Sequence, residues 1–190
     1  MTILRYSGAC LLAMAIFARP LTTKAKEALL VLDRSGSHVA IEVKATVHSF
    51  VARLENFDAA ITIDPDSGRV ESTAFHANLS AVKTGRADRD HDMGMWLQTN
   101  EFPQVIFELE ALERRSDGGF TARGQFQLHG QRHPVSFPVK ITADHRLTTI
   151  DGMAAVDTRE FGLPIIRMFW VLTVDPVVHV RFHLQGVLPP

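Results

Sequence analysis

The chain has 190 residues, 46% of them hydrophobic, and its 20 lysines and arginines are balanced by 21 aspartates and glutamates. A formal charge of −1 gives no basic footprint for nucleic acid, so we expect none among the partners. The single cysteine excludes an intramolecular disulfide. Because it lies at Cys10, the rest of the chain has no thiol nucleophile and no thiolate metal site.

The N-terminal segment has the order of a secretory signal. Arg5 precedes an apolar run at residues 10–18, Pro20 ends the run, and Thr23 and Ala25 are small residues suited to signal peptidase. The run is much shorter than the roughly 20 residues of a membrane-spanning helix. We therefore predict a signal peptide at residues 1–25, one domain at residues 26–190 and a periplasmic location, which suits an exported chain without disulfides. The alternative is an uncleaved N-terminal membrane anchor.

From residue 29 onward, hydrophobic and polar residues alternate along the chain. Successive side chains of a strand point to opposite faces, so each alternating segment predicts a strand with one apolar and one wet face, as in an antiparallel sheet. The predicted strands begin near Ala28, Val39, Phe50, Val70, Val105, Phe120, Val135 and Val171, with a shorter one at residues 148–156. About eight short strands at regular spacing indicate an all-β sandwich or barrel.

Residues 84–97 break this alternation. Met93, Trp96 and Leu97 recur at spacings of three and four, which predicts a short helix with one apolar side. A single helix in an all-β chain can cover one end of a barrel, and we expect an ion pair between Arg89 and Asp90 to hold it there. Residues 157–164 form a second irregular segment, which we expect to be a tight loop or a single helical turn.

Five short motifs resemble those of the YceI-like family of periplasmic polyisoprenoid-binding proteins, in the family's order and over residues 29–187. They are His48-Ser49-Phe50 with Phe57 and Ile61, Thr84-Gly85 before Arg89-Asp90, residues 101–107, residues 124–130 with Pro134-Val135, and residues 159–162. Asp92 departs from the family, which often has histidine at this position.

The resemblance implies a single lipocalin-like antiparallel barrel whose interior holds an isoprenoid tail, such as that of a quinone or polyprenyl lipid. A barrel of eight strands is wide enough to be filled by its own side chains or to hold one small ligand. The candidate ligand-binding residues are the inward Phe75, Phe107, Phe126, Phe137 and Phe182, the helical Met93, Met95 and Trp96, and Phe161 at the mouth. The three helical residues have a second interpretation, in which they only seal the barrel end.

Two other functions stay open at this point. The first is a solid barrel that acts as a stress-protective or interaction module. The second, which we favour less, is an enzyme that acts on a lipid headgroup through His48, Arg89, Asp90 or Asp92. We expect no catalytic role, no cofactor and no metal site, because pairs such as His129 with His133 and His179 with His183 fit solvated positions on a β exterior. Besides the lipid, transient membrane contact is the other partner considered, and the sequence does not predict the oligomeric state.

Overall fold

The computed structural model describes residues 27–46, 48–168 and 172–189, so the predicted signal peptide lies outside the described residues. The main elements are β3 (His38–Val43), β4 (Phe50–Leu54), β5 (Phe57–Asp64), β6 (Arg69–Asn78), α1 (Ala87–Trp96), β8 (Gln104–Arg114), β9 (Phe120–Leu128), β10 (Gln131–Asp144), β11 (Leu147–Asp157) and β14 (Val177–Val187). Shorter elements are β1 (Ala28–Leu29), β2 (Val31–Leu32), η1 (Leu79–Ala81), β7 (Val82–Lys83), η2 (Thr158–Phe161), β12 (Arg167–Met168) and β13 (Leu172–Thr173).

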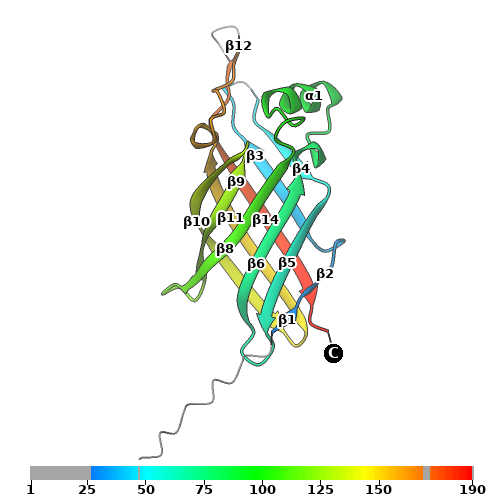
Figure 1. Cartoon of the computed structure of the whole chain (residues 1–190), viewed down its shortest axis with the longest axis vertical. Coiled ribbons are helices and arrows are strands. Elements are labelled where there is room, and N and C mark those ends of the chain that lie inside the picture. Colours follow the sequence, from blue (N-terminus) through cyan, green and yellow to red (C-terminus); the bar gives the residue numbers. More distant parts are fainter. Residues whose placement is uncertain (1–26, 47, 169–171, 190) are drawn as a thin grey trace, which may run out of the picture.

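The long strands form one antiparallel sheet that curls into a barrel (Figure 1). Its order is β5-β6-β8-β9-β10-β11-β14-β3-β4, with β1 outside β5 and β7 outside β4. Glu55 and Asn56 alone separate β4 from β5, so these two strands are the halves of one bent strand. The upper half pairs with β3 and the lower half with β6, which joins the two edges of the sheet. Counted in this way, the barrel has eight strands, and the prediction of an all-β antiparallel barrel is confirmed.

The two ends of the barrel differ. Helix α1 and the β12–β13 hairpin lie at one end, here called the mouth, whereas β1, β2 and the C-terminus lie at the other, here called the base (Figure 1). At the base, residues 28–33 cross between β5 and β14. Ala28 and Leu29 pair with β5, and Val31 and Leu32 pair with β14. This crossing segment fills the gap that the short β3 and β4 leave below them.

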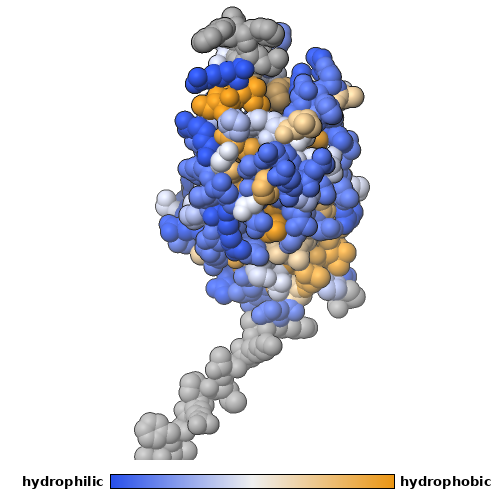
Figure 2. Space-filling view, turned by 45° about the horizontal axis from the view of Figure 1, so that its top comes forward, coloured by the Kyte–Doolittle hydropathy of each residue, from blue (hydrophilic) through white to orange (hydrophobic). Residues whose placement is uncertain are grey.

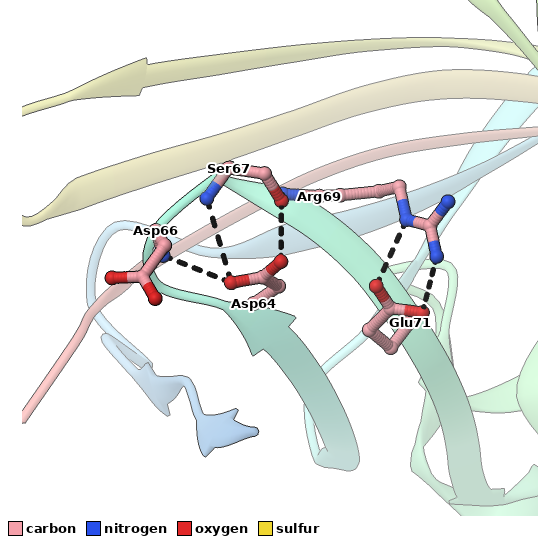
Figure 3. Close-up of polar contacts among 5 residues, drawn as sticks. All are labelled: Asp64, Asp66, Ser67, Arg69 and Glu71. Atoms are coloured by element: carbon pink, nitrogen blue, oxygen red, sulfur yellow. Dashed lines mark hydrogen bonds and ion pairs between the residues drawn. The ribbon is translucent and has the colours of Figure 1, made fainter. Parts of the chain in front are cut away.

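The turns at the base use side-chain hydrogen bonds to fix their geometry. Figure 3 shows the β5–β6 turn, where the Asp64 carboxylate accepts hydrogen bonds from the backbone N–H groups of Asp66 and Ser67 and from the Ser67 hydroxyl, at 2.9, 3.4 and 2.8 Å. Gly68 supplies the positive φ of 69° that closes the turn. Beyond the turn, Arg69 donates two hydrogen bonds to Glu71. Asp64, Pro65 and Gly68 are residue types typical of such a turn.

Two predicted strands have different bounds in the structure. Val171, where one of them was expected to begin, lies outside the described residues. Beside it, β13 covers only Leu172–Thr173, and the long strand β14 begins at Val177, because Asp175 and Pro176 interrupt the apolar sequence before it. The strand expected to be short, at residues 148–156, is the full-length β11. It looked short because Gly152 and two alanines weaken its alternation, yet it pairs along its whole length with β14.

Candidate functional site

The inward face of the barrel encloses an apolar cavity of about 250 Å³. It extends from residues near the base, such as Ile61 and Leu184, to Met93 and Trp96 of α1 at the mouth. Of the 32 lining residues, Thr73 and Thr158 have hydroxyl side chains and the other 30 are aliphatic, aromatic or methionine. The volume is near the lower end of the ~300–1,000 Å³ typical of small-molecule pockets. A dry tube of this kind can hold an apolar chain but offers almost no polar contact along its length.

Three phenylalanine rings form one wall of this cavity. The Phe137 ring lies between those of Phe107 and Phe182, with centroid distances of 5.3 and 5.8 Å. The rings lie close to the sheet because glycines face them. A Cβ on Gly124 would lie 2.8 Å from the Phe107 ring, and a Cβ on Gly152 would lie 2.3 Å from the Phe182 ring. The two glycines therefore leave the middle of the barrel open by letting the rings lie against the wall.

Many inward side chains keep accessible surface, which shows that the interior of the barrel is hollow. Phe75, Phe107, Phe126 and Phe182 face the cavity and are only partly buried. In a barrel filled by its own side chains, these rings would have lost almost all of their accessible surface. At the base, by contrast, Leu30, Ile61 and Ile63 are 3%, 0% and 0% exposed. The crossing segment thus closes the base, with Leu30 as its inward plug.

Helix α1 is fixed over the mouth by three contacts. The Trp96 indole N–H donates a 2.9 Å hydrogen bond to the Pro164 carbonyl, and the Arg89 guanidinium lies 4.3 Å from the centre of the Phe50 ring. The Asp90 carboxylate accepts hydrogen bonds from the Thr84 backbone N–H and hydroxyl at 2.8 and 2.6 Å. The Thr84 hydroxyl, followed by its N–H, lowers the pKa of Asp90. These contacts join the helix to the segment after η2 at Pro164, to β4 at Phe50 and to the loop before the helix at Thr84.

The expected ion pair between Arg89 and Asp90 is wrong. A nearer hydrogen-bond donor, Thr84, occupies the Asp90 carboxylate, and the Arg89 guanidinium stacks on Phe50 instead. Met95 also departs from expectation. It is 66% exposed and does not line the cavity, because Met93 and Trp96 occupy the inward side of the helix and Met95 projects away from it.

The other candidate residues fall into two groups. The structure brings seven of them together around the cavity: Phe75, Met93, Trp96, Phe107, Phe126, Phe137 and Phe182. Phe161 lies behind this wall, 1% exposed, with its ring edge-on to Phe126 at 5.6 Å and to His133 at 5.1 Å. Phe161 therefore packs behind the rings at the mouth and is not among the cavity-lining residues.

Several histidines are structural and not solvated as expected. His129 lies against Phe102 at 4.4 Å, and its two ring nitrogens are 3.1 Å from the Phe161 carbonyl oxygen and 2.6 Å from Gln98 Oε1. It therefore joins three segments at the mouth. On the outer wall, His183 pairs with Asp151 at 2.7 Å and stacks on His38. Within residues 27–46, 48–168 and 172–189, no group of three or more His, Cys, Asp and Glu side chains is arranged to hold a metal ion.

The candidates for headgroup chemistry do not converge on the cavity. His48 and Asp92 are exposed, while Arg89 and Asp90 make the contacts described above, and none of the four lines the cavity. In the part of the chain that the structure describes, no helix is long and apolar enough to cross a bilayer.

The residues that sequence reasoning missed are Leu30 and Gly152. An isolated glycine inside a strand is a recognised sign of close approach and could have indicated the second.

The family model for the YceI-like domain matches residues 30–186. The chain belongs to the YceI-like domain family. A curated relative of this YceI-like chain is a UPF0312 protein of Vibrio cholerae serotype O1, which is 19% identical over 184 residues covering 91% of this chain and 93% of the relative.

Solved structures share the YceI-like fold. BcnA of Burkholderia cenocepacia is 18% identical with a TM-score of 0.72, and the match covers 82% of this chain and 99% of BcnA. A polyisoprenoid-binding domain from Saccharophagus degradans, implicated in plant cell wall breakdown, is 13% identical with a TM-score of 0.59, covering 86% and 98%. The YceI protein of Campylobacter jejuni is 14% identical with a TM-score of 0.54, covering 59% and 70%. At these identities the likeness establishes the fold.

Proposed function

We propose that this YceI-like protein is a periplasmic binding protein or carrier that holds an isoprenoid-type lipid, such as a quinone or polyprenyl lipid, inside its barrel. The observation that carries the proposal is the continuous apolar cavity that runs from the base to α1. The solved polyisoprenoid-binding domain of the same fold supports this ligand class. The hollow interior argues against a solid interaction module.

The cavity also favours one direction of binding. Its deep end is closed by Leu30 and has no charged lining residue, so a polar headgroup there would lose its hydration without replacement. The mouth, by contrast, carries exposed polar residues of α1 and the neighbouring loops. The tail therefore enters first and the headgroup stays near Trp96.

Burial of the tail alone provides enough free energy for useful affinity. Ten methylene groups transferred from water contribute roughly 8 kcal/mol, from which the ordering of a flexible chain subtracts a part. Without that cost, 8 kcal/mol would correspond to a dissociation constant of about 1 μM, and each further buried methylene group adds about 0.8 kcal/mol. Binding of this strength needs no catalytic group, so we propose a binding protein and not an enzyme.

The test is to purify the protein, extract it with organic solvent and identify bound lipids by mass spectrometry. A matched pair of variants makes the result specific to the cavity. Ala154 lines the cavity and its neighbour Ala155 faces outward on the same strand. We expect Ala154→Leu to lower the lipid content per protein and Ala155→Leu to leave it unchanged. Repeated absence of prenyl or acyl species, or equal loss in both variants, would contradict the proposal.

A further inference from the structure

An apolar ridge lies on the outside of the barrel at its base. It consists of Leu29, Val31, Leu147 and Val187, which are 57%, 56%, 37% and 42% exposed, and is here called the base ridge. Val187 pairs directly with both Leu147 and Val31, so the three side chains lie next to one another on three strands. Leu29 extends the row, because Leu30 faces inward and the residues on either side of it, Leu29 and Val31, are both exposed. Figure 2 shows hydrophobic residues in two places on a mostly hydrophilic face, one toward the base and one near the mouth.

The base ridge interrupts a polar exterior. The four consecutive outward residues of β14 before Val187 are His179, Arg181, His183 and Gln185, so the outer face of this strand is polar along its middle and becomes apolar at the base. The ridge is also not a by-product of core packing. Leu30 alone faces inward between Leu29 and Val31, and the outer two side chains contribute little to the interior. A group of adjacent exposed apolar side chains of this size is often functional.

We propose that the base ridge docks on the surface of a lipid bilayer. The described chain begins at Glu27, beside the ridge, and the apolar run at residues 10–18 precedes it by eight intervening residues. Eight residues span at most about 28 Å when fully extended. While that apolar run is attached and in the membrane, as expected of a signal peptide before cleavage or of an uncleaved anchor, the ridge therefore lies within a short distance of the same membrane.

The size of the base ridge fits a bilayer better than a second copy of the chain. Its four partly exposed side chains present roughly 300 Å², compared with about 800 Å² per partner in a stable protein interface. A bilayer needs no matching surface and accepts a few inserted apolar side chains. Charges beside the ridge are of both signs, with Glu27 and Arg146 in the sequence around it, and the Arg146 guanidinium already donates to the Leu188 carbonyl. We therefore expect binding to zwitterionic lipid that changes little with salt.

Docking in this way would leave the mouth facing away from the bilayer, where α1 is free to meet another membrane or protein. The inference does not depend on the occupant of the cavity, because the base ridge lies outside the barrel wall. Its failure would leave the lipid content measured above unchanged, and an empty barrel could still dock.

The test is flotation of the exported protein, purified after removal of the predicted signal peptide, with phosphatidylcholine vesicles. The double variant V31T/V187T keeps β-branched residues and side-chain size while removing two apolar ends of the ridge. Val51→Thr is the matched control, because Val51 is 52% exposed on the outer face of β4, away from the ridge. From the loss of two buried methyl groups, we expect V31T/V187T to lower vesicle partition about ten-fold and V51T to leave it as in the wild type.

A second measurement reports the orientation. Because the single cysteine, Cys10, lies in the predicted signal peptide, the exported protein has none, and an environment-sensitive fluorophore is placed at T62C, beside Leu29, or at H91C on α1. Docking predicts a blue shift with vesicles at position 62 and none at position 91. Equal partition of all three proteins together with no shift at position 62 would overturn the proposal. So would a concentration-dependent dimer, without lipid, that V31T/V187T abolishes, because a second copy would then cover the ridge.

Discussion

Replacing Gly152 by alanine tests directly whether the glycines keep the cavity open. A Cβ at this position would lie 2.3 Å from Cζ of Phe182 and 2.9 and 3.0 Å from its two Cε atoms. The ring would have to move by about 1 Å to reach ordinary contact distance. Since Phe182 lines the cavity and lies edge-on to Phe137, we expect the ring to move into the cavity.

The size of the effect follows from overpacking. A misfit of this kind costs about 1–3 kcal/mol, and in a domain of this length each kcal/mol lowers Tm by about 2–4 °C. We therefore expect Gly152→Ala to lower Tm by about 2–12 °C and to reduce the bound lipid per protein. The assays are thermal and urea unfolding, both followed by circular dichroism, and mass spectrometry of the extracted lipid.

The double variant G152A/F182L decides whether the ring is the cause. Leucine at position 182 lacks the ring atoms that the new Cβ would meet, so G152A should cost at least 1 kcal/mol less in the F182L background than in the wild type. If the costs of the two substitutions simply add, within about 0.5 kcal/mol, the steric explanation for the open cavity is wrong.

Three further changes test the mouth and its helix. Trp96→Phe removes the hydrogen bond to the Pro164 carbonyl, which should lower the free energy of unfolding by about 1 kcal/mol and speed lipid release. Stopped-flow transfer to acceptor vesicles measures the release rate, and an unchanged rate would show that this bond does not hold the helix over the mouth. Hydrogen bonds from Thr84 lower the pKa of Asp90, so the Asp90 carboxylate stabilises the fold above the ordinary carboxyl pKa, and this stabilisation is lost as pH falls through the lowered pKa. Asp90→Asn should therefore flatten the fall in stability below about pH 4, which measurements of Tm at decreasing pH can detect. Gly94→Ala on α1, where a Cβ would meet only ordinary contacts, should stabilise the protein by about 0.5–1 kcal/mol; a destabilised variant would mean that the helix packs more tightly than its contacts indicate.

The barrel could be predicted from the sequence because its wall follows a simple rule. In β10, Val135, Phe137, Val139 and Ile141 alternate with polar residues or proline, and all four line the cavity. The same rule placed most of the phenylalanines correctly. It could not show whether the interior was filled or hollow, because that depends on how close each ring lies to the sheet. This distance is set by cross-strand neighbours such as Gly124 and Gly152, which only the register brings opposite a ring.

The mouth was harder to predict because its contacts join distant segments. The spacing of Met93 and Trp96 identified the helix and its inward side, but Met95 was included because it is adjacent in sequence and apolar. The neighbouring charges of Arg89 and Asp90 suggested a pair, whereas each finds its partner in another segment, at Phe50 and Thr84. No pattern along the chain indicates that Trp96 donates to Pro164, 68 residues further on.

The closure of the barrel also constrains the order in which the chain can fold. Both β2 and β3, near the start of the described chain, pair with β14 at its end. The ring therefore cannot be completed until Val177–Val187 has been synthesised, and the closing contacts span nearly the whole sequence. Such long loop closures slow folding. A chain of this kind therefore cannot complete its fold before its last strand is available. An incompletely folded chain is the form that a translocation channel for unfolded polypeptides requires.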